Sequence, residues 1–256
     1  MNGTTVQVLA ASMFAPGLSG PVARFAVPSS ISGTNARGDL LPPRMRRGTS
    51  ALTRLFVEVT AAVAPTRPLD GLRFVFGSAW GEANTAVALL EMRHNGDGQL
   101  SPARFAQSVH NTATGLLSIA TGNREPSTAI AAGADTVAMC LLEAIGWLNE
   151  SDVPVLVAVA DECPPASLAP GFQHAPFAAA FLLARTARAG ESLGSCRFVR
   201  SALGAASHSL PPDLVRCPAA RALPLLEALA RRTAGTVQLG DRPATYGVDL
   251  TFAESQ

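Results

Sequence analysis

Lysine is absent from this 256-residue sequence, because all twenty of its basic residues are arginine. Without lysine the chain can form no Schiff base, and it has neither a P-loop lysine nor a serine–lysine pair. Aromatic residues make up only 5%, and no basic patch with interleaved aromatics is present, so we expect no binding to nucleic acid. The net charge of +1 and the 15% of charged residues fit one compact domain with a large core.

Cysteine is sparse and scattered. Cys140, Cys163, Cys196 and Cys217 form no CxxC pair and no Cys/His cluster with metal-ligand spacing, so we expect no metal site, no other cofactor and no disulfide framework. The longest apolar run, Ala175–Ala184, is too short to span a bilayer. The first twenty residues carry no positively charged segment, so no signal peptide is expected. The sequence predicts a cytoplasmic protein that does not contact a membrane.

Strand-like and helix-like patterns alternate along the chain. We expect strands at residues 5–16, 72–80, 128–132, 153–162, 236–240 and 245–252. We expect helices at residues 42–64, 82–94, 101–122, 134–144 and 217–235. The run at residues 175–187 fits a helix or a buried strand, because periodicity does not decide between them. This alternation predicts an α/β layer architecture.

One segment has the pattern of a nucleophile elbow. Pro126–Ala144 fits a buried strand, a tight turn of small residues and a helix, the arrangement that holds up a reactive side chain in many enzymes. The residue at the turn is Ala134. A methyl group can neither accept an acyl group nor transfer a proton, so Ala134 is not a catalytic residue.

The segments around this turn resemble the N-terminal half of β-ketoacyl synthases. "SPARFAQSVHNTATGLLSIATG" is similar to a helical stretch of that family, "NREPS" to its turn and "TAIAAG" to its strand. Ala134 falls at the position of the family's nucleophilic cysteine. The upstream segments "LPPRMRRGTSALTRLFVEV" and "VFGSAWGEANTAVALLE" resemble the family as well, so the resemblance covers residues 5–185.

The resemblance implies a thiolase-like α/β fold, mainly its N-terminal half, with a mixed sheet packed between helices and a short helix and β-hairpin as a tail. We expect a single truncated ketosynthase-like domain over residues 1–256, with the N-terminal half at 1–200 and the tail at 201–256. The family's two catalytic histidines lie in its C-terminal half. His208, the one histidine beyond residue 200, stands in neither of their sequence contexts.

The loss of the nucleophile and of the histidines resembles chain-length factors, which pair with an active ketosynthase; a short type is associated with aryl polyene biosynthesis. The resemblance therefore implies a non-catalytic subunit of a heterodimer. Such a subunit would shape the partner's acyl tunnel in polyene or fatty-acid-like polyketide biosynthesis, and it would meet an acyl carrier protein through the complex. A first half with a short tail would also leave apolar surface exposed, which favours obligate pairing.

The resemblance assigns positions to the tunnel and the dimer interface. The strand at residues 128–132 corresponds to the family's dimerisation strand. The tunnel or interface residues are Phe105, Gln107, His110, Asn111, Thr112, Thr128, Ile130, Ala132, Ala138 and Met139. A tryptophan at Thr112 or Ala138 should then shorten the product. A role in local hydrogen bonds or in the core stays open for these residues.

Other interpretations remain. Asp135 fits an N-terminal cap of the following helix, or a substitute acid. Cys140, about 9 Å further along a helix, fits a buried small residue or a displaced nucleophile. If either residue acted in catalysis, the chain would be a self-contained carrier-dependent decarboxylase or thioesterase. A third possibility is a homodimeric acyl-binding scaffold. Arg44, Arg46 and Arg47 fit either a docking patch for an acidic carrier protein or a solvated face.

Overall fold

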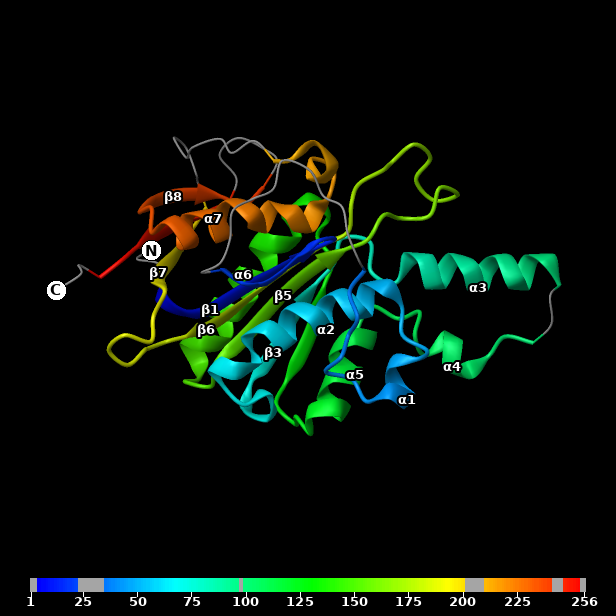
Figure 1. Cartoon of the computed structure of the whole chain (residues 1–256), viewed down its shortest axis with the longest axis horizontal. Helices are drawn as coiled ribbons and strands as arrows, with labels where there is room; N and C mark the ends of the chain where they lie inside the picture. Colours follow the sequence, from blue (N-terminus) through cyan, green and yellow to red (C-terminus); the bar gives the residue numbers. More distant parts are fainter. Residues whose placement is uncertain (1–3, 23–34, 97–98, 201–209, 241–245, 254–256) are drawn as a thin grey trace.

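A mixed sheet of nine strands runs through the molecule in the computed structural model (Figure 1), which describes residues 4–22, 35–96, 99–200, 210–240 and 246–253. The strands are β1 (Thr5–Ala15), β2 (Leu18–Pro21), β3 (Arg73–Gly77), β4 (Ser127–Ile130), β5 (Val155–Asp161), β6 (Phe177–Ala184), β7 (Gly194–Val199), β8 (Gly235–Gln238) and β9 (Gly247–Thr251). His208 lies outside the described residues.

The strand order is β4-β3-β5-β6-β1-β7-β9-β8. β4, β3 and β5 are parallel, whereas β6 is antiparallel to both β5 and β1. β7 and β2 share one edge of β1, because β7 pairs with its first half and β2 with its last residues. β4 therefore forms one border of the sheet and β8 the other.

Helices cover both faces of the sheet. The α-helices are α1 (Pro43–Arg46), α2 (Ala51–Val63), α3 (Ala83–Asn95), α4 (Pro102–Phe105), α5 (Thr112–Thr121), α6 (Thr136–Glu150) and α7 (Leu223–Arg231). Short 3₁₀ turns lie at η2 (Ala64–Thr66), η3 (Leu69–Gly71), η4 (Gly133–Asp135), η5 (Pro212–Leu214) and η6 (Pro218–Ala222). The buried side chains of α2 and α5 pack on one face, and those of α6, η6 and α7 pack on the other. The sheet is thus the middle of three layers.

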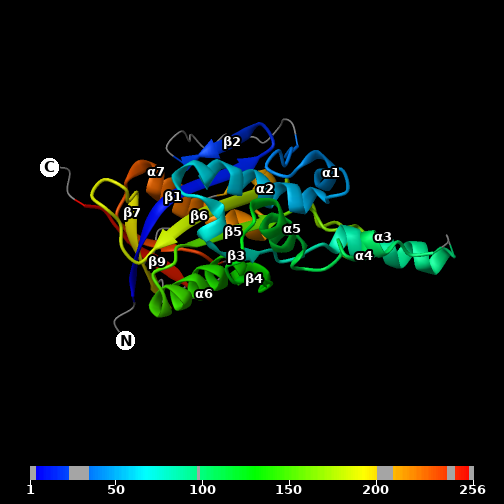
Figure 2. The same cartoon turned by 90° about the horizontal axis from the view of Figure 1, so that it is seen from below.

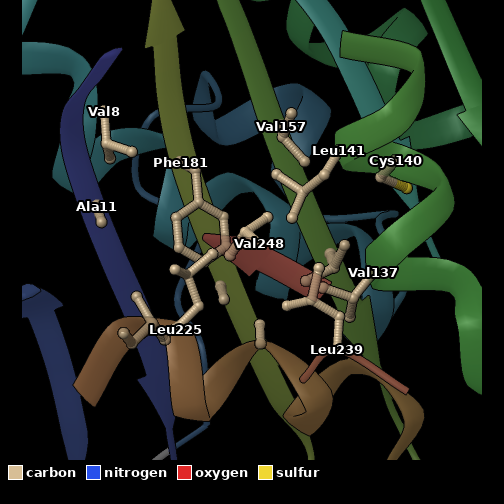
Figure 3. Packing of buried hydrophobic residues seen from close by; sticks show 14 of the residues in the cluster. Val8, Ala11, Val137, Cys140, Leu141, Val157, Phe181, Leu225, Leu239 and Val248 are labelled. Atoms are coloured by element: carbon tan, nitrogen blue, oxygen red, sulfur yellow. The ribbon is translucent and has the colours of Figure 1, made fainter. Parts of the chain in front are cut away.

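The ambiguous run at residues 175–187 contains a strand. β6 lies between β5 and β1, and all eight of its side chains are buried. A central strand that is covered on both faces has no polar alternation to reveal it, which explains why the pattern alone was undecided. Figure 3 shows Phe181 of β6 in the layer between the sheet and the helices, near Leu141 of α6 and Leu225 of α7.

The tail belongs to the same core. β7, β9 and β8 continue the sheet beyond β1, and Cys217, Leu225 and Leu239 are buried together with Val137 and Phe181. η6 and α7 therefore cover this face of the sheet. Exposed apolar side chains occur elsewhere. They are Leu90, Leu100, Phe105, Val109, Ile119, Leu142, Leu168 and Val215.

α3 departs most from this compact packing. α3 and α4 extend away from the sheet beside one another (Figure 1, Figure 2). Leu89 is the one buried side chain of α3. A helix that buries so little of its own surface depends for its stability on contacts with neighbouring segments or with a partner protein.

Candidate functional site at the vacant elbow

The expected strand, turn and helix form an elbow at the border of the sheet. β4 ends at Ile130, Gly133 takes the left-handed conformation at φ +57°, and α6 begins at Thr136. The hydroxyl of Thr136 donates to the carbonyl of Gly133 at 2.8 Å and accepts from the amide of Ala132 at 3.0 Å. The strand is shifted from the expected residues 128–132, so that Ala132 lies in the turn rather than in β4.

Asp135 does not cap the helix with its side chain. It occupies the position before α6, yet its carboxylate makes no capping hydrogen bond. Asp135 is thus the N-cap residue of α6, as expected, but the side-chain hydrogen bond of a cap is absent. The hydroxyl of Thr136 closes the turn instead, and no sequence pattern favours it over the neighbouring Asp135.

Ala134 lies in η4, half-buried, two residues before the start of α6. A thiol at this position would stand close to the positive end of the α6 dipole, which favours a thiolate. The strand, turn and helix expected of an elbow are thus present in order, without a reactive atom at Ala134. With a methyl group at Ala134, the turn offers no side-chain atom that could form a covalent bond with an acyl group.

Cys140 has the opposite environment to that of a reactive thiol. Its side chain is fully buried in the core cluster, under β3. Burial, and secondarily the charges of Asp161 and Glu143, raise the pKa of the thiol far above its usual range. The thiolate is strongly disfavoured, so the displaced-nucleophile interpretation of Cys140 finds no support.

Asp161, which the sequence analysis did not single out, is the most buried carboxylate beside the elbow. It ends β5 and is fully buried. Its Oδ1 accepts from the Ser78 hydroxyl at 2.8 Å and from the Ala79 amide at 2.9 Å, and its Oδ2 accepts from the Ala219 amide at 3.0 Å. Burial raises the pKa of Asp161 to about 7, although these hydrogen bonds act in the opposite direction. The available signal was an aspartate that follows directly on an apolar strand.

Glu82 is a second buried carboxylate. Its Oε1 accepts from the hydroxyls of Ser50 at 2.6 Å and Thr53 at 2.9 Å, and its Oε2 accepts from Thr85 at 3.1 Å. Burial raises the pKa of Glu82, and its hydrogen bonds and nearby His110 lower it. The carboxylate therefore ties the start of α2 to the start of α3.

His110 lies against the turn that follows β3. A side chain at Gly81, where φ is +56°, would meet His110 Nδ1 at 2.5 Å, so glycine is required there. His110 Nε2 is buried and has no hydrogen-bond partner in the described part of the chain. An unsatisfied ring nitrogen is costly, which makes His110 a candidate for contact with a water molecule or a bound group.

The other residues expected between α4 and α5 have mixed surroundings. The amide of Gln107 lies against Gly48, and the hydroxyl of Thr112 donates to the carbonyls of Val109 at 2.7 Å and Ala106 at 3.2 Å. Phe105 is 62% exposed. Asn111 is exposed and makes no capping hydrogen bond with α5.

The expected site residues lie in two places: at the carboxyl ends of the parallel strands, and along β4 and α6. The segment from α4 to the start of α5 and the end of β4 lie at the carboxyl ends of the parallel strands, where α/β proteins bind ligands. Thr128 and Ile130 are half-buried on β4, and Met139 is half-buried on α6. Ala138, by contrast, is fully buried in the core between α6 and the sheet.

The described residues contain no group of three or more His, Cys, Asp or Glu side chains that could hold a metal ion. Within the same ranges, no helix has the length and apolar character needed to cross a membrane.

Solved structures share this fold at low sequence identity. The complex of the ketosynthase ApeO with its chain length factor ApeC from Xenorhabdus doucetiae contains a chain that matches with a TM-score of 0.69 and 22% identity, over 97% of this chain and 99% of that one. The ishigamide ketosynthase/chain length factor matches with a TM-score of 0.61 and 19% identity, over 78% of this chain and 68% of that one.

A type II polyketide synthase ketosynthase, solved with its acyl-carrier protein, matches with a TM-score of 0.53 and 13% identity, over 77% of this chain and 64% of that one. No curated protein matches the sequence. These likenesses establish the thiolase-like ketosynthase fold. The family model for the N-terminal domain of β-ketoacyl synthases matches residues 26–240. The chain therefore belongs to the β-ketoacyl synthase family through this N-terminal domain.

Proposed function

We propose that this chain is a non-catalytic subunit of the chain-length-factor type, which pairs with an active β-ketoacyl synthase and shapes that enzyme's acyl tunnel. The observation that carries the proposal is the intact elbow with Ala134 in place of a nucleophile. A fold that keeps the elbow without the reactive atom has a use for its shape rather than for its chemistry. Complexes of ketosynthases with chain length factors among the structural neighbours support the same role.

The free edge of β4 is the proposed contact with the partner. The carbonyls of Pro126 and Ile130 accept hydrogen bonds from β3, at 3.2 Å from Phe74 N and 3.1 Å from Ser78 N. Because backbone groups alternate in direction along a strand, the N–H and C=O of Ala129 point away from β3. A strand of the partner can therefore add to this edge antiparallel.

The helices beside β4 support this assignment. α5 and α6 flank the strand on its two faces (Figure 2). Ile119 of α5 is 72% exposed and Leu142 of α6 is 44% exposed. A free strand edge between two exposed apolar side chains has the composition of the core of a protein interface.

In the complex, the residues around the elbow would line the shared acyl tunnel. We assign Phe105, His110, Thr112 and Met139 to its wall, and Thr128 and Ile130 to the dimer contact. The acyl carrier protein would deliver its substrate to the ketosynthase, where the thiolate resides. The products would be polyene or fatty-acid-like polyketide chains, made in the cytoplasm.

The first experiment is co-expression with a full-length ketosynthase, with a tag on this chain alone, followed by mass determination of the co-purified proteins. A 1:1 complex that elongates chains, when neither subunit does so alone, supports the proposal. A stable homodimer that leaves the ketosynthase behind contradicts it, and so does turnover of a malonyl-carrier substrate by this chain alone.

The strand contact has its own matched pair of variants. Ala129→Pro removes the N–H that points to the free edge and leaves the hydrogen bonds with β3 in place. Ala129→Val keeps the N–H and suits a strand. Co-purification should be lost with Ala129→Pro and retained with Ala129→Val. Equal recovery of the two complexes would show that the partner does not pair with β4.

A further inference from the structure

Asp161 joins three segments that are far apart in the sequence. Its Oδ1 accepts hydrogen bonds from the Ser78 hydroxyl and from the amides of Ala79 and Trp80, the last at 3.4 Å. The Ser78 hydroxyl oxygen also accepts from the Gly81 amide at 2.9 Å. The turn from Ser78 to Gly81 is therefore wrapped around one oxygen of a single carboxylate.

The second oxygen holds the tail. Asp161 Oδ2 accepts from the amide of Ala219, which lies in η6. η6 packs on η4, the turn that contains Ala134, and also on α6 and β5. Ala219 and Ala220 have essentially no exposed surface. One hydrogen bond to Asp161 thus fixes the segment that covers the elbow from the side of the core.

The turn held by Oδ1 in turn positions a predicted tunnel residue. Gly81 provides the surface against which His110 packs, and α3 begins two residues later. Trp80 packs edge-on against Phe172, at 5.5 Å between ring centroids. A shift of the turn would move His110 and the start of α3 together.

We propose that Asp161 is a positioning residue for the vacant elbow, whose carboxylate clamps η6 onto η4 and ties that clamp to the Ser78–Gly81 turn. The link to an acyl tunnel rests on the proposed function, but the clamp itself does not. The two oxygens differ in the number of hydrogen bonds that they accept. Oδ1 accepts from three donors and Oδ2 from one. The neutral acid therefore carries its proton on Oδ2, which keeps a lone pair for the Ala219 amide.

The surroundings of Asp161 place its protonation near neutral pH, because burial raises its pKa to about 7. The titratable side chains that interact with its charge are the thiols of Cys140 on α6 and Cys217 before η6. Burial raises the pKa of both thiols, so both stay neutral while Asp161 titrates. Glu143 on α6 and Arg221 on η6 act on these thiols. Because burial disfavours the charged form, a rise in pH through this range should loosen the tail, whose opening lets water reach the carboxylate, and should keep the turn.

The test is hydrogen–deuterium exchange on the full chain, read separately in peptides that cover residues 78–82 and 217–222. Asp161→Asn keeps an oxygen for the turn and places an amide group opposite the Ala219 N–H. We expect protection at residues 217–222 to fall at least tenfold, while residues 78–82 stay protected. Ser78→Ala is the complementary variant, which should loosen residues 78–82 and leave the tail protected.

The wild-type pH dependence separates a clamp from a merely structural role. After correction for intrinsic exchange, protection at residues 217–222 should fall as the pH rises from 6 to 8, whereas protection at residues 78–82 should not. Asp161→Asn should remove this pH dependence. Two outcomes overturn the inference. One is an equal loss of protection in both peptides of Asp161→Asn, and the other is wild-type protection at residues 217–222 that does not change with pH.

If Asp161→Asn does not fold, the wild-type pH profile and Ser78→Ala still decide the matter. The outcome is also independent of the proposed function. Failure of the clamp appears as unchanged exchange in a chain that still binds its ketosynthase. Failure of the proposed function appears as absence of the complex.

Discussion

The thiol of Cys140 occupies the space that a side chain at Gly77 would need. A Cβ added at Gly77 would collide with Cys140 Sγ, and it would lie only 2.8 Å from Thr136 Cγ2 and 3.3 Å from Val159 Cγ1. Gly77 is the last residue of β3, and Thr136 is the first of α6. The close approach of this helix to this strand fixes the start of α6, and hence the elbow, relative to the sheet.

Gly77→Ala should therefore destabilise the fold through overpacking, by about 1–3 kcal/mol. Cys140→Ala alone removes one buried sulfur atom and should cost on the order of 1 kcal/mol. In the Cys140→Ala background, Gly77→Ala should cost less, because its closest neighbour is gone, although the Thr136 methyl group remains. Urea denaturation of the four proteins measures this coupling. Strictly additive costs would mean that the two positions do not compete for the same space.

The stability of the fold should decrease as the pH rises towards neutrality because of Asp161. Burial raises its pKa from 3.8 to about 7. A group whose pKa is raised on folding contributes stability that is fully present below the unfolded value and is lost as the pH rises through the folded value. The expected loss between pH 4 and pH 8 is at most roughly 4 kcal/mol for this fully buried group.

Denaturant unfolding at a series of pH values measures this dependence. Asp161→Asn is the control, because an amide does not titrate. Its curve should be flatter over the same range than the wild-type curve. A wild-type protein whose stability is constant from pH 4 to pH 8 would contradict the prediction.

The sequence predicted the segments whose order and spacing resemble a family, and it missed what depends on contacts between distant residues. The elbow around Ala134 and the alternation of layers were recognisable because they are local patterns. The hydrogen bonds that Glu82 makes to α2, and those that Asp161 makes to Ser78 and Ala219, span 29 to 83 residues. No local pattern identifies such partners.

The tail illustrates the same limit. Its helix and its two final strands were expected, but β7, which lies just before the tail, was not. The sequence also gave no sign that β7 and β9 would extend the sheet from the edge of β1, because pairing of β1 with β7 joins residues 5–8 to residues 194–197. The side-chain hydrogen bond expected of Asp135 as a cap is absent for a different reason. Several side chains near a helix start can satisfy the same turn, and the hydroxyl of Thr136 does so here.

Partner binding should depend on the apolar side chains that flank β4. Leu142→Arg places a charge in the middle of the proposed interface and should abolish or greatly weaken binding of the ketosynthase. Leu142 is exposed in the isolated chain, so the stability of that chain should change by only about 0.5 kcal/mol or less. The measurement is binding of each variant to a ketosynthase that is immobilised on a surface.

Thr251→Arg is the matched control for this substitution. Thr251 is exposed on β9, at the opposite end of the sheet from β4. The Thr251→Arg substitution adds the same charge outside the proposed interface, so binding of the ketosynthase should stay at the wild-type level. Equal loss of binding in both variants would point to a general charge effect, and equal retention would move the interface away from α6.

Product length should respond to bulk at Met139. This side chain is half-buried on α6, one helical turn from exposed Leu142, so it can face both the core and a partner's tunnel. Ala138→Trp is a poor test, because Ala138 lies in the core and a tryptophan there would overpack it. Met139→Trp should shorten the longest product, whereas Met139→Leu, which conserves volume, should not.

Thr112→Val extends this test to the other side of the elbow. It keeps the shape of the side chain and removes the hydroxyl that donates to Val109 and Ala106. Loosening of the start of α5 should broaden the distribution of product lengths rather than shorten it. Mass spectrometry of products from equal amounts of each complex measures both effects. If Met139→Trp forms the complex and leaves the distribution unchanged, the tunnel does not reach α6, and its floor has to be sought on the side of Phe105 and His110.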